Sequence, residues 1–118
     1  MKQILYNEQN LQESDINRTT KRAKILIINS NNEILLVHCN NNYFFVGGRV
    51  EENESFIDCI KREIKEETGV SITIDNIDPF YSIVYMNKDY PKININTKSI
   101  INYYCIKNDI KPDLEKIS

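Results

Sequence analysis

The chain has 118 residues, 41% of them hydrophobic and 27% charged, so its size suits one small domain with a single core. Its formal net charge is −2 and its basic residues are spread along the sequence, which argues against bulk nucleic acid as a partner. The N-terminus lacks the apolar run of a signal peptide, and no window approaches the roughly 20 apolar residues of a membrane span, so we expect a cytoplasmic protein without membrane contact.

The N-terminal segment differs from the rest of the chain. Residues 1–18 are polar apart from a short strand-like patch at 4–6, and we treat them as an N-terminal extension whose role the sequence does not reveal. The remaining residues, 19–118, are expected to form the domain.

The first half of the domain has the pattern of short strands. Two apolar, β-branched runs flank the turn signal Asn31-Asn32 and predict a hairpin. A second asparagine turn at 40–42 precedes another strand, and the Gly47-Gly48 pair should then break regular structure. The expected strands are 24–28, 33–37 and 43–46.

A helix is expected next, because apolar residues recur at helical spacing between 55 and 68. Asn53 or Ser55 can cap its start, and Gly69 occupies the position where a left-handed residue commonly ends a helix. Further strands are expected at 70–74, 80–86 and 99–106. The segment 109–118 is too short and polar to supply a second helix.

The cysteines and the histidine do not form a recognisable metal or disulfide pattern. Cys39, Cys59 and Cys105 contain no C-x-x-C pair, and we predict that they are reduced thiols. His38 follows an apolar run at a strand end, so a structural or exposed role is favoured over catalysis.

The acidic residues of the predicted helix carry the functional signal. Glu63 and Glu67 lie on one face as a like-charged i, i+4 pair, and Glu66 stands one step around the helix. They crowd the last two turns, where the helix dipole disfavours negative charge. Lys61 and Lys65 lie on the other side, so a solvated, self-neutralised face explains the pattern poorly. Clustered carboxylates suit a hard cation such as Mg²⁺ or Mn²⁺, and through it phosphate chemistry.

These residues complete the pattern G-x5-E-x7-R-E-U-x-E-E-x-G-U, where U is aliphatic, in the segment GRVEENESFIDCIKREIKEETGV. The sequence therefore resembles the Nudix hydrolase (MutT-like) family, over roughly residues 23–106. Nine specified positions agree, which is far more specific than a lone glycine motif. The matching residues are Gly48, Glu54, Arg62, Glu63, Ile64, Glu66, Glu67, Gly69 and Val70.

The resemblance implies an α/β fold, a Nudix-type α/β/α sandwich with a mixed β-sheet, here without its usual C-terminal helix. It implies hydrolysis of a phosphoanhydride bond in a nucleoside diphosphate linked to another group, with Mg²⁺ or Mn²⁺ as cofactor and a small-molecule nucleotide as substrate. A homodimer stays open. The alternative is a non-catalytic Nudix-like domain that binds a nucleotide in a regulatory role, although such domains would be expected to lose box acids. A plain structural domain does not explain the joint Gly, Arg and Glu spacing.

The resemblance also implies residue roles. Glu63, Glu66 and Glu67 would bind the metal and take part in catalysis, with the Gly47 carbonyl as an additional ligand. Arg62 would position the acids, with an i, i+4 pair to Glu66 allowed by its spacing. Gly48 and Arg49 would contact substrate, and Glu54 and Gly69 would support the box structurally, with Glu54 buttressing the helix through Arg62. Glu63 is one candidate for the general base, and four later carboxylates stay open for that role: Asp89, Asp109, Asp113 and Glu115.

The substrate itself is not identified by the sequence. Tyr43, Phe44 and Phe45 could stack on a nucleobase, with core packing as the default interpretation. Tyr85 lies near the tyrosine position of dinucleoside-polyphosphate hydrolases, and here too packing within the sheet is favoured.

Overall fold

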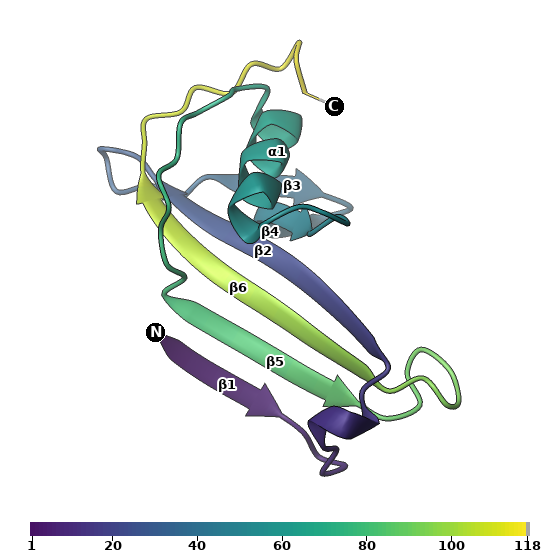
Figure 1. The fold of residues 1–118 in the computed structure, drawn as a ribbon. Helices are drawn as coiled ribbons and strands as arrows, with labels where there is room; N and C mark the ends of the chain where they lie inside the picture. Colours follow the sequence, from purple (N-terminus) through teal and green to yellow (C-terminus); the bar gives the residue numbers. More distant parts are fainter. Residues whose placement is uncertain (118) are drawn as a thin grey trace.

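A mixed sheet of six strands forms the body of the molecule, in the order β1-β5-β6-β2-β4-β3 (Figure 1). The structure is a computed structural model and describes residues 1–117. Parallel pairing joins β1 to β5 and β2 to β6, and the other neighbours are antiparallel. The elements are β1 (Lys2–Tyr6), the 3-10 helix η1 (Glu13–Asp15), β2 (Arg18–Ile28), β3 (Leu36–Cys39), β4 (Asn42–Arg49), α1 (Phe56–Thr68), β5 (Tyr81–Asn87) and β6 (Thr97–Lys107).

The helix α1 agrees closely with its sequence prediction. Ser55 is the N-cap, and its hydroxyl accepts a hydrogen bond of 3.0 Å from the backbone N–H of Asp58. Gly69 ends the helix with φ at 78°, in the left-handed region that a side chain disfavours. The two ends of α1 are therefore set by local chemistry.

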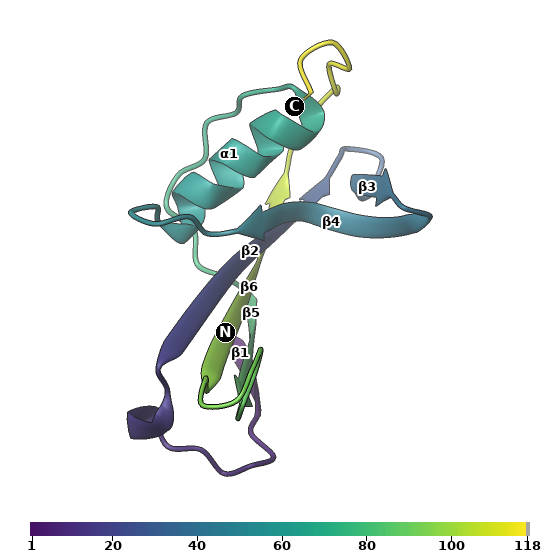
Figure 2. The ribbon, with the colours of Figure 1, turned by 90° about the vertical axis from the view of Figure 1, so that its right-hand side faces the viewer.

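The core lies between α1 and one face of the sheet at β2 and β4 (Figure 2). Alternate residues of β2 point toward the helix, as expected for the two-residue period of a strand. The helix contributes side chains at i, i+1 and i+5 spacing to the same core. The buried residues of this core are Ala23, Ile25, Ile27, Val46, Cys59, Ile60, Ile64, Ile74 and Tyr104.

The hairpin predicted from 24–28 and 33–37 forms only next to its turn. An antiparallel bridge joins Ile28 to Ile34, and the backbone N–H groups of Asn29 and Leu35 donate to the carbonyls of Glu33 and Ile27, whereas the chain from Leu36 onward, in β3, pairs with β4, which lies next to β2. The reason is the turn at Asn40 and Asn41, where both residues have positive φ. Two such residues form the tight turn that matches the twist of a hairpin, so the closer pair of strands forms there.

Two other expectations fail near the helix. The Gly47-Gly48 pair does not interrupt the strand, because β4 continues through both glycines to Arg49. Gly47 has φ at 142°, and a Cβ there would lie 2.1 Å from the Ala23 carbonyl oxygen, so glycine permits the strands to approach. The segment 70–74 is not a strand. Its Ile74 is buried in the core without a ladder, so the apolar run reflected burial rather than sheet pairing.

The sheet extends further than the sequence indicated. Residues 18–22 of β2 are polar yet pair in register with β6, and β1 adds a parallel edge strand beside β5. The mixed sheet and the helix are as predicted. Within residues 1–117, α1 is the α-helix that covers the sheet, and no second helical layer is present. In the same part of the chain, no helix has the length and apolar character of a membrane span.

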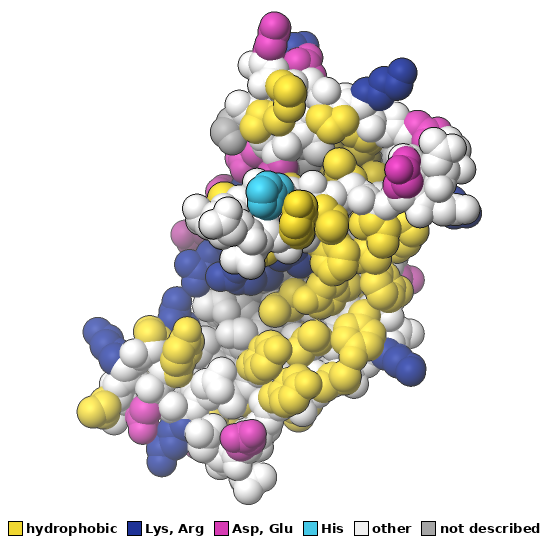
Figure 3. Space-filling view, turned by 180° about the vertical axis from the view of Figure 1, so that it is seen from behind, with side chains coloured by type: hydrophobic (Ala, Val, Ile, Leu, Met, Phe, Trp, Pro, Cys, Tyr) yellow, Lys and Arg dark blue, Asp and Glu magenta, His cyan; other side chains and the backbone are white. Residues whose placement is uncertain are grey.

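The face of the sheet opposite α1 is open to solvent (Figure 3). A large area of apolar and aromatic side chains covers part of this face, and a band of lysine and arginine side chains lies beside it. Tyr6 and Tyr85 stack there with ring centroids 5.1 Å apart, which confirms the packing role favoured for Tyr85.

Candidate active site

The end of β4 and the acidic face of α1 meet at Gly48 and Glu63. A Cβ on Gly48 would lie 2.5 Å from Glu63 Oε1, so the absence of a side chain lets this carboxylate rest against the strand backbone. The Glu63 side chain is 13% exposed. The first glycine of the motif therefore determines where the first acid of the helix can lie.

Glu67 lies one turn further along α1, and its carboxyl is next to that of Glu63. Burial raises the pKa of its carboxyl to about 7, and contact with the neighbouring Glu63 carboxyl adds to the increase. The Gly47 backbone and the charge of Lys24 act in the opposite direction. The two carboxyls thus form a close pair whose negative charge is only partly compensated, as the like-charged spacing predicted.

Arg62 connects four acidic residues. Its guanidinium contacts Glu54 Oε2 at 2.8 Å, Glu63 Oε1 at 2.9 Å and Glu66 Oε2 at 3.2 Å. Glu51 lies further away, at 3.6 Å. The predicted i, i+4 pair with Glu66 is present. Lys61 and Lys65 make no ion pair with these acids among the described residues, as expected, and Arg62 partly compensates Glu63 and Glu66.

The loop between β4 and α1 is tied to the helix by the same arginine. Glu54 receives two hydrogen bonds from Arg62, which hold the pKa of the Glu54 carboxyl below its usual range. Arg62 Nη2 also donates to the Arg49 carbonyl at 3.0 Å. The buried Cys59 thiol lies 3.6 Å from the Gly48 carbonyl oxygen, and burial raises its pKa to about 11. Glu54 thus connects the loop to the helix through Arg62.

The donor set suits a hard divalent cation. Glu63 and Glu67 offer carboxylate oxygens beside the backbone of Gly47 and Gly48, and oxygen is the ligand that Mg²⁺ and Mn²⁺ prefer. In the part of the chain that the structure describes, no three His, Cys, Asp or Glu side chains converge on one point. Glu66 turns toward Arg62, and its side chain is 42% exposed. Such a pair fits a Mg²⁺ ion that also uses waters and substrate phosphate as ligands.

The four later carboxylates that remained candidates for the general base lie in other parts of the structure than Glu63 and Glu67. Asp89 accepts from the backbone N–H of Asn94 in the β5–β6 loop, and Asp109 accepts two hydrogen bonds from Ser30. The backbone of Asp113 packs on the end of α1, where its N–H donates to the Thr68 carbonyl at 2.7 Å, and Glu115 is exposed. None of the four has a described contact with Glu63 or Glu67.

An apolar pocket of 400 Å³ lies on the open face of the sheet. Phe45 and Tyr103 form part of its wall and meet edge to face. Tyr43 and Phe44 are 69% and 46% exposed, so core packing is the wrong interpretation for these two residues. The exposed His38 stacks on Tyr43, as expected for a non-catalytic histidine. The pocket is lined by Lys24, Ile34, Leu36, Tyr43, Phe44, Phe45 and Tyr103.

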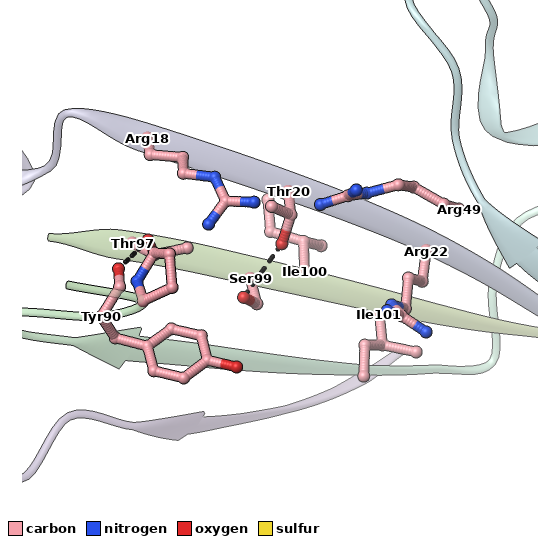
Figure 4. A pocket seen from close by; sticks show the side chains of 10 residues that line it. Arg18, Thr20, Arg22, Arg49, Tyr90, Thr97, Ser99, Ile100 and Ile101 are labelled. Atoms are coloured by element: carbon pink, nitrogen blue, oxygen red, sulfur yellow. Dashed lines mark hydrogen bonds between the residues drawn. The ribbon is translucent and has the colours of Figure 1, made fainter. Parts of the chain in front are cut away.

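A second hollow on this face of the sheet was not predicted from the sequence. It is lined by Arg18 and Arg22 of β2 and by Arg49 of β4 (Figure 4). Arg49 was expected to contact substrate, whereas the other two lie in the polar part of β2 that the sequence did not identify as strand. Arg18 and Arg22 are four residues apart and therefore share one strand face, which would have revealed them once the strand was known.

Comparisons with known proteins agree on one family. The model of the NUDIX domain matches residues 18–114. Dihydroneopterin triphosphate pyrophosphohydrolase of E. coli has a similar fold, with a TM-score of 0.60 and 16% identity over 82% of this chain and 75% of that one. A NUDIX-family hydrolase from Clostridium perfringens gives 0.54 and 21% over 83% and 74%. The MutT protein from Methanosarcina mazei Go1 gives 0.50 and 23% over 86% and 75%. A search of curated protein sequences found no match.

Proposed function

Because this chain belongs to the Nudix family of hydrolases, which act on acid anhydrides, we propose that it cleaves a phosphoanhydride bond in a nucleoside diphosphate linked to another group. Enzymes of this family generally use a divalent cation, and Mg²⁺ or Mn²⁺ is proposed here. The observation that carries the proposal is the pair of carboxyls, Glu63 and Glu67, held against the glycine backbone at the end of β4. The pair is electrostatically unfavourable unless a cation or a proton joins it.

In this proposal the acidic residues of α1 bind the cation. Glu63, Glu67 and, after release from Arg62, Glu66 would hold it, with the Gly47 carbonyl as a further ligand. A bound divalent cation would neutralise the diphosphate oxygens and lower the pKa of a water molecule. A carboxylate of the Glu63 and Glu67 pair would take the proton from the attacking water. Arg62 acts as a positioning residue, since its guanidinium contacts the Glu63 carboxylate on one side. On the other side, Gly48 has no side chain that would displace this carboxylate.

The nucleoside is assigned to the apolar pocket on the open face. Tyr43 and Phe44 are exposed there, and aromatic rings that lack a core role are suited to stacking on a base. Lys24 lines this pocket and lies opposite Gly47 in the sheet, and Gly47 precedes the Gly48 backbone that Glu63 contacts. A nucleotide seated in the pocket would bring its diphosphate to the carboxyl pair.

A substrate panel tests the proposed activity. We expect turnover of at least one nucleoside triphosphate, nucleotide sugar or related nucleoside diphosphate derivative in millimolar Mg²⁺ or Mn²⁺, and none with a chelator present. Phosphate or pyrophosphate release is the measurement, with added phosphatase for products that are monoesters. Binding of nucleotides without turnover across the panel would favour the non-catalytic, regulatory alternative.

Divalent metal should also stabilise the fold. A ligand that binds the native state raises the melting temperature, so we expect a rise that saturates with Mg²⁺ or Mn²⁺ concentration. Glu67→Gln removes one anionic ligand and should reduce the rise, whereas Glu52→Gln, at an exposed loop position, should not. A melting temperature that stays constant in millimolar metal, both alone and with a non-hydrolysable nucleotide, would contradict the assigned cation site.

A further inference from the structure

Three arginines gather in the hollow on the open face of the sheet, which we name the arginine groove after Arg18, Arg22 and Arg49. It has a volume of 340 Å³. Figure 4 shows the guanidinium groups of Arg18 and Arg49 pointing toward each other across Thr20. The Thr20 hydroxyl donates to Ser99 Oγ at 3.0 Å, so the floor of the groove is also polar.

The positive charge of the groove has no carboxylate partner in the described part of the chain. Arg22 and Arg49 lie directly opposite each other on β2 and β4, an arrangement of like charges that destabilises a sheet locally. None of the three arginines makes an ion pair with a carboxylate among residues 1–117. This is notable in a chain with 17 acidic and 15 basic residues. An anion from solution would compensate the groove, as a cation would compensate the acids of α1.

The groove begins one residue along β4 from the backbone that Glu63 contacts. Arg49 follows Gly48, against which Glu63 rests, and its carbonyl receives a hydrogen bond from Arg62. On β2, Arg22 lies opposite Arg49 and Lys24 lies opposite Gly47, so the basic row runs alongside the part of β4 whose Gly48 backbone Glu63 contacts. Arg22 and Arg49 line the arginine groove and Lys24 lines the apolar pocket, so the groove and the pocket adjoin this part of β4.

We propose that the arginine groove binds a third phosphate of the substrate, the one attached to the nucleoside diphosphate on the side away from the nucleoside. This inference rests on the proposed function. Guanidinium groups match phosphate oxygens in charge and in the geometry of paired hydrogen bonds. The preferred substrates then carry at least one phosphate more than a nucleoside diphosphate, and a neutral sugar in that position gains nothing from the groove.

A binding experiment tests the groove without catalysis. Inorganic tripolyphosphate is titrated into the protein by calorimetry with a chelator present, so that the acids of α1 hold no cation. Arg22→Gln and Arg18→Gln should each weaken binding about 10-fold. Lys21→Gln is the matched control, because Lys21 lies between them on β2 but its ammonium group sits 5.9 Å from the Phe56 ring on the helix side. Equal binding by all four proteins, or no binding by the unchanged protein, overturns the proposal.

A kinetic experiment then connects the groove to the reaction. One nucleoside is offered as its triphosphate and as its diphosphate, which differ by the single phosphate assigned to the groove. The unchanged protein should prefer the triphosphate, and Arg22→Gln should lower kcat/KM for it about 10-fold while changing the value for the diphosphate less than about twofold. Equal losses on both substrates, or no preference in the unchanged protein, contradict the groove assignment. Absence of all turnover contradicts the proposed function instead, and the tripolyphosphate titration still decides the groove.

Discussion

Glu67→Gln should lower the rate of hydrolysis at least about 100-fold, because the cation loses an anionic ligand and the phosphate charge is less well neutralised. The metal-free fold should be as stable as before, or more stable by about 0.5 to 1 kcal/mol, since the change removes repulsion with Glu63 and with the helix dipole. Activity and stability thus move in opposite directions. Turnover and chemical denaturation are measured on the same preparation, with Glu52→Gln as the matched control.

The gain in stability should depend on pH. Burial raises the pKa of Glu67 to about 7 in the folded protein, above its value in the unfolded chain. A carboxyl whose pKa is higher in the folded protein than in the unfolded chain stabilises the fold at pH values below its unfolded pKa. This stabilisation is lost as the pH rises through its folded pKa. The metal-free variant and the unchanged protein should therefore be equally stable near pH 4.5, and the variant should be the more stable at pH 8. A variant that melts markedly lower at pH 8 would show that Glu67 forms an essential structural ion pair.

Arg62→Ala should have the largest effect on stability, about 2 to 3 kcal/mol of destabilisation. The substitution leaves Glu54 and Glu63, each with a side chain 13% exposed, without their common partner. Both would remain as partly buried negative charges, and Glu63 would still lie next to Glu67. The free energy of unfolding in denaturant is the measurement.

The arginine is also expected to position Glu63, so activity should fall about 100-fold at temperatures well below melting, with a higher Mg²⁺ concentration needed for half of the maximal rate. Arg62→Lys keeps the charge but loses the paired hydrogen bonds to Glu54, and an intermediate result is expected. Lys61→Ala, on the exposed side of the same helix, is the control. If Arg62→Ala behaved like Lys61→Ala in both measurements, the connecting role of Arg62 would be wrong.

The helix and its acids could be predicted because their determinants are local. Ser55 and Gly69 define the ends of α1 through backbone chemistry within a few residues. The spacing of Glu63 and Glu67 then places both carboxyls on one helix face regardless of the remaining fold. The glycine before the helix was also visible in the sequence, although its contact with the Glu63 carboxyl was not.

Features that depend on distant pairing could not be predicted. Residues 18–22 are polar and carry no strand pattern, and they become strand because β6 lies beside them. The arginine groove depends on that pairing and on Arg22 meeting Arg49 across strands. The contact of Arg62 with Glu54 was expected only from the family resemblance, because it requires the loop after β4 to fold back on the helix, which the local sequence does not specify.

Hydrolysis in ¹⁸O-labelled water tests the central claim most directly. The claim predicts that a nucleoside diphosphate derivative incubated with the protein and Mg²⁺ gives two phosphate-containing products, one of which carries one labelled oxygen per cleavage, as mass spectrometry would show. Chelator should leave the substrate intact and unlabelled. Recovery of intact, unlabelled nucleotide in the presence of Mg²⁺, from a protein that demonstrably binds it, would contradict the assignment of this chain as a metal-dependent pyrophosphohydrolase.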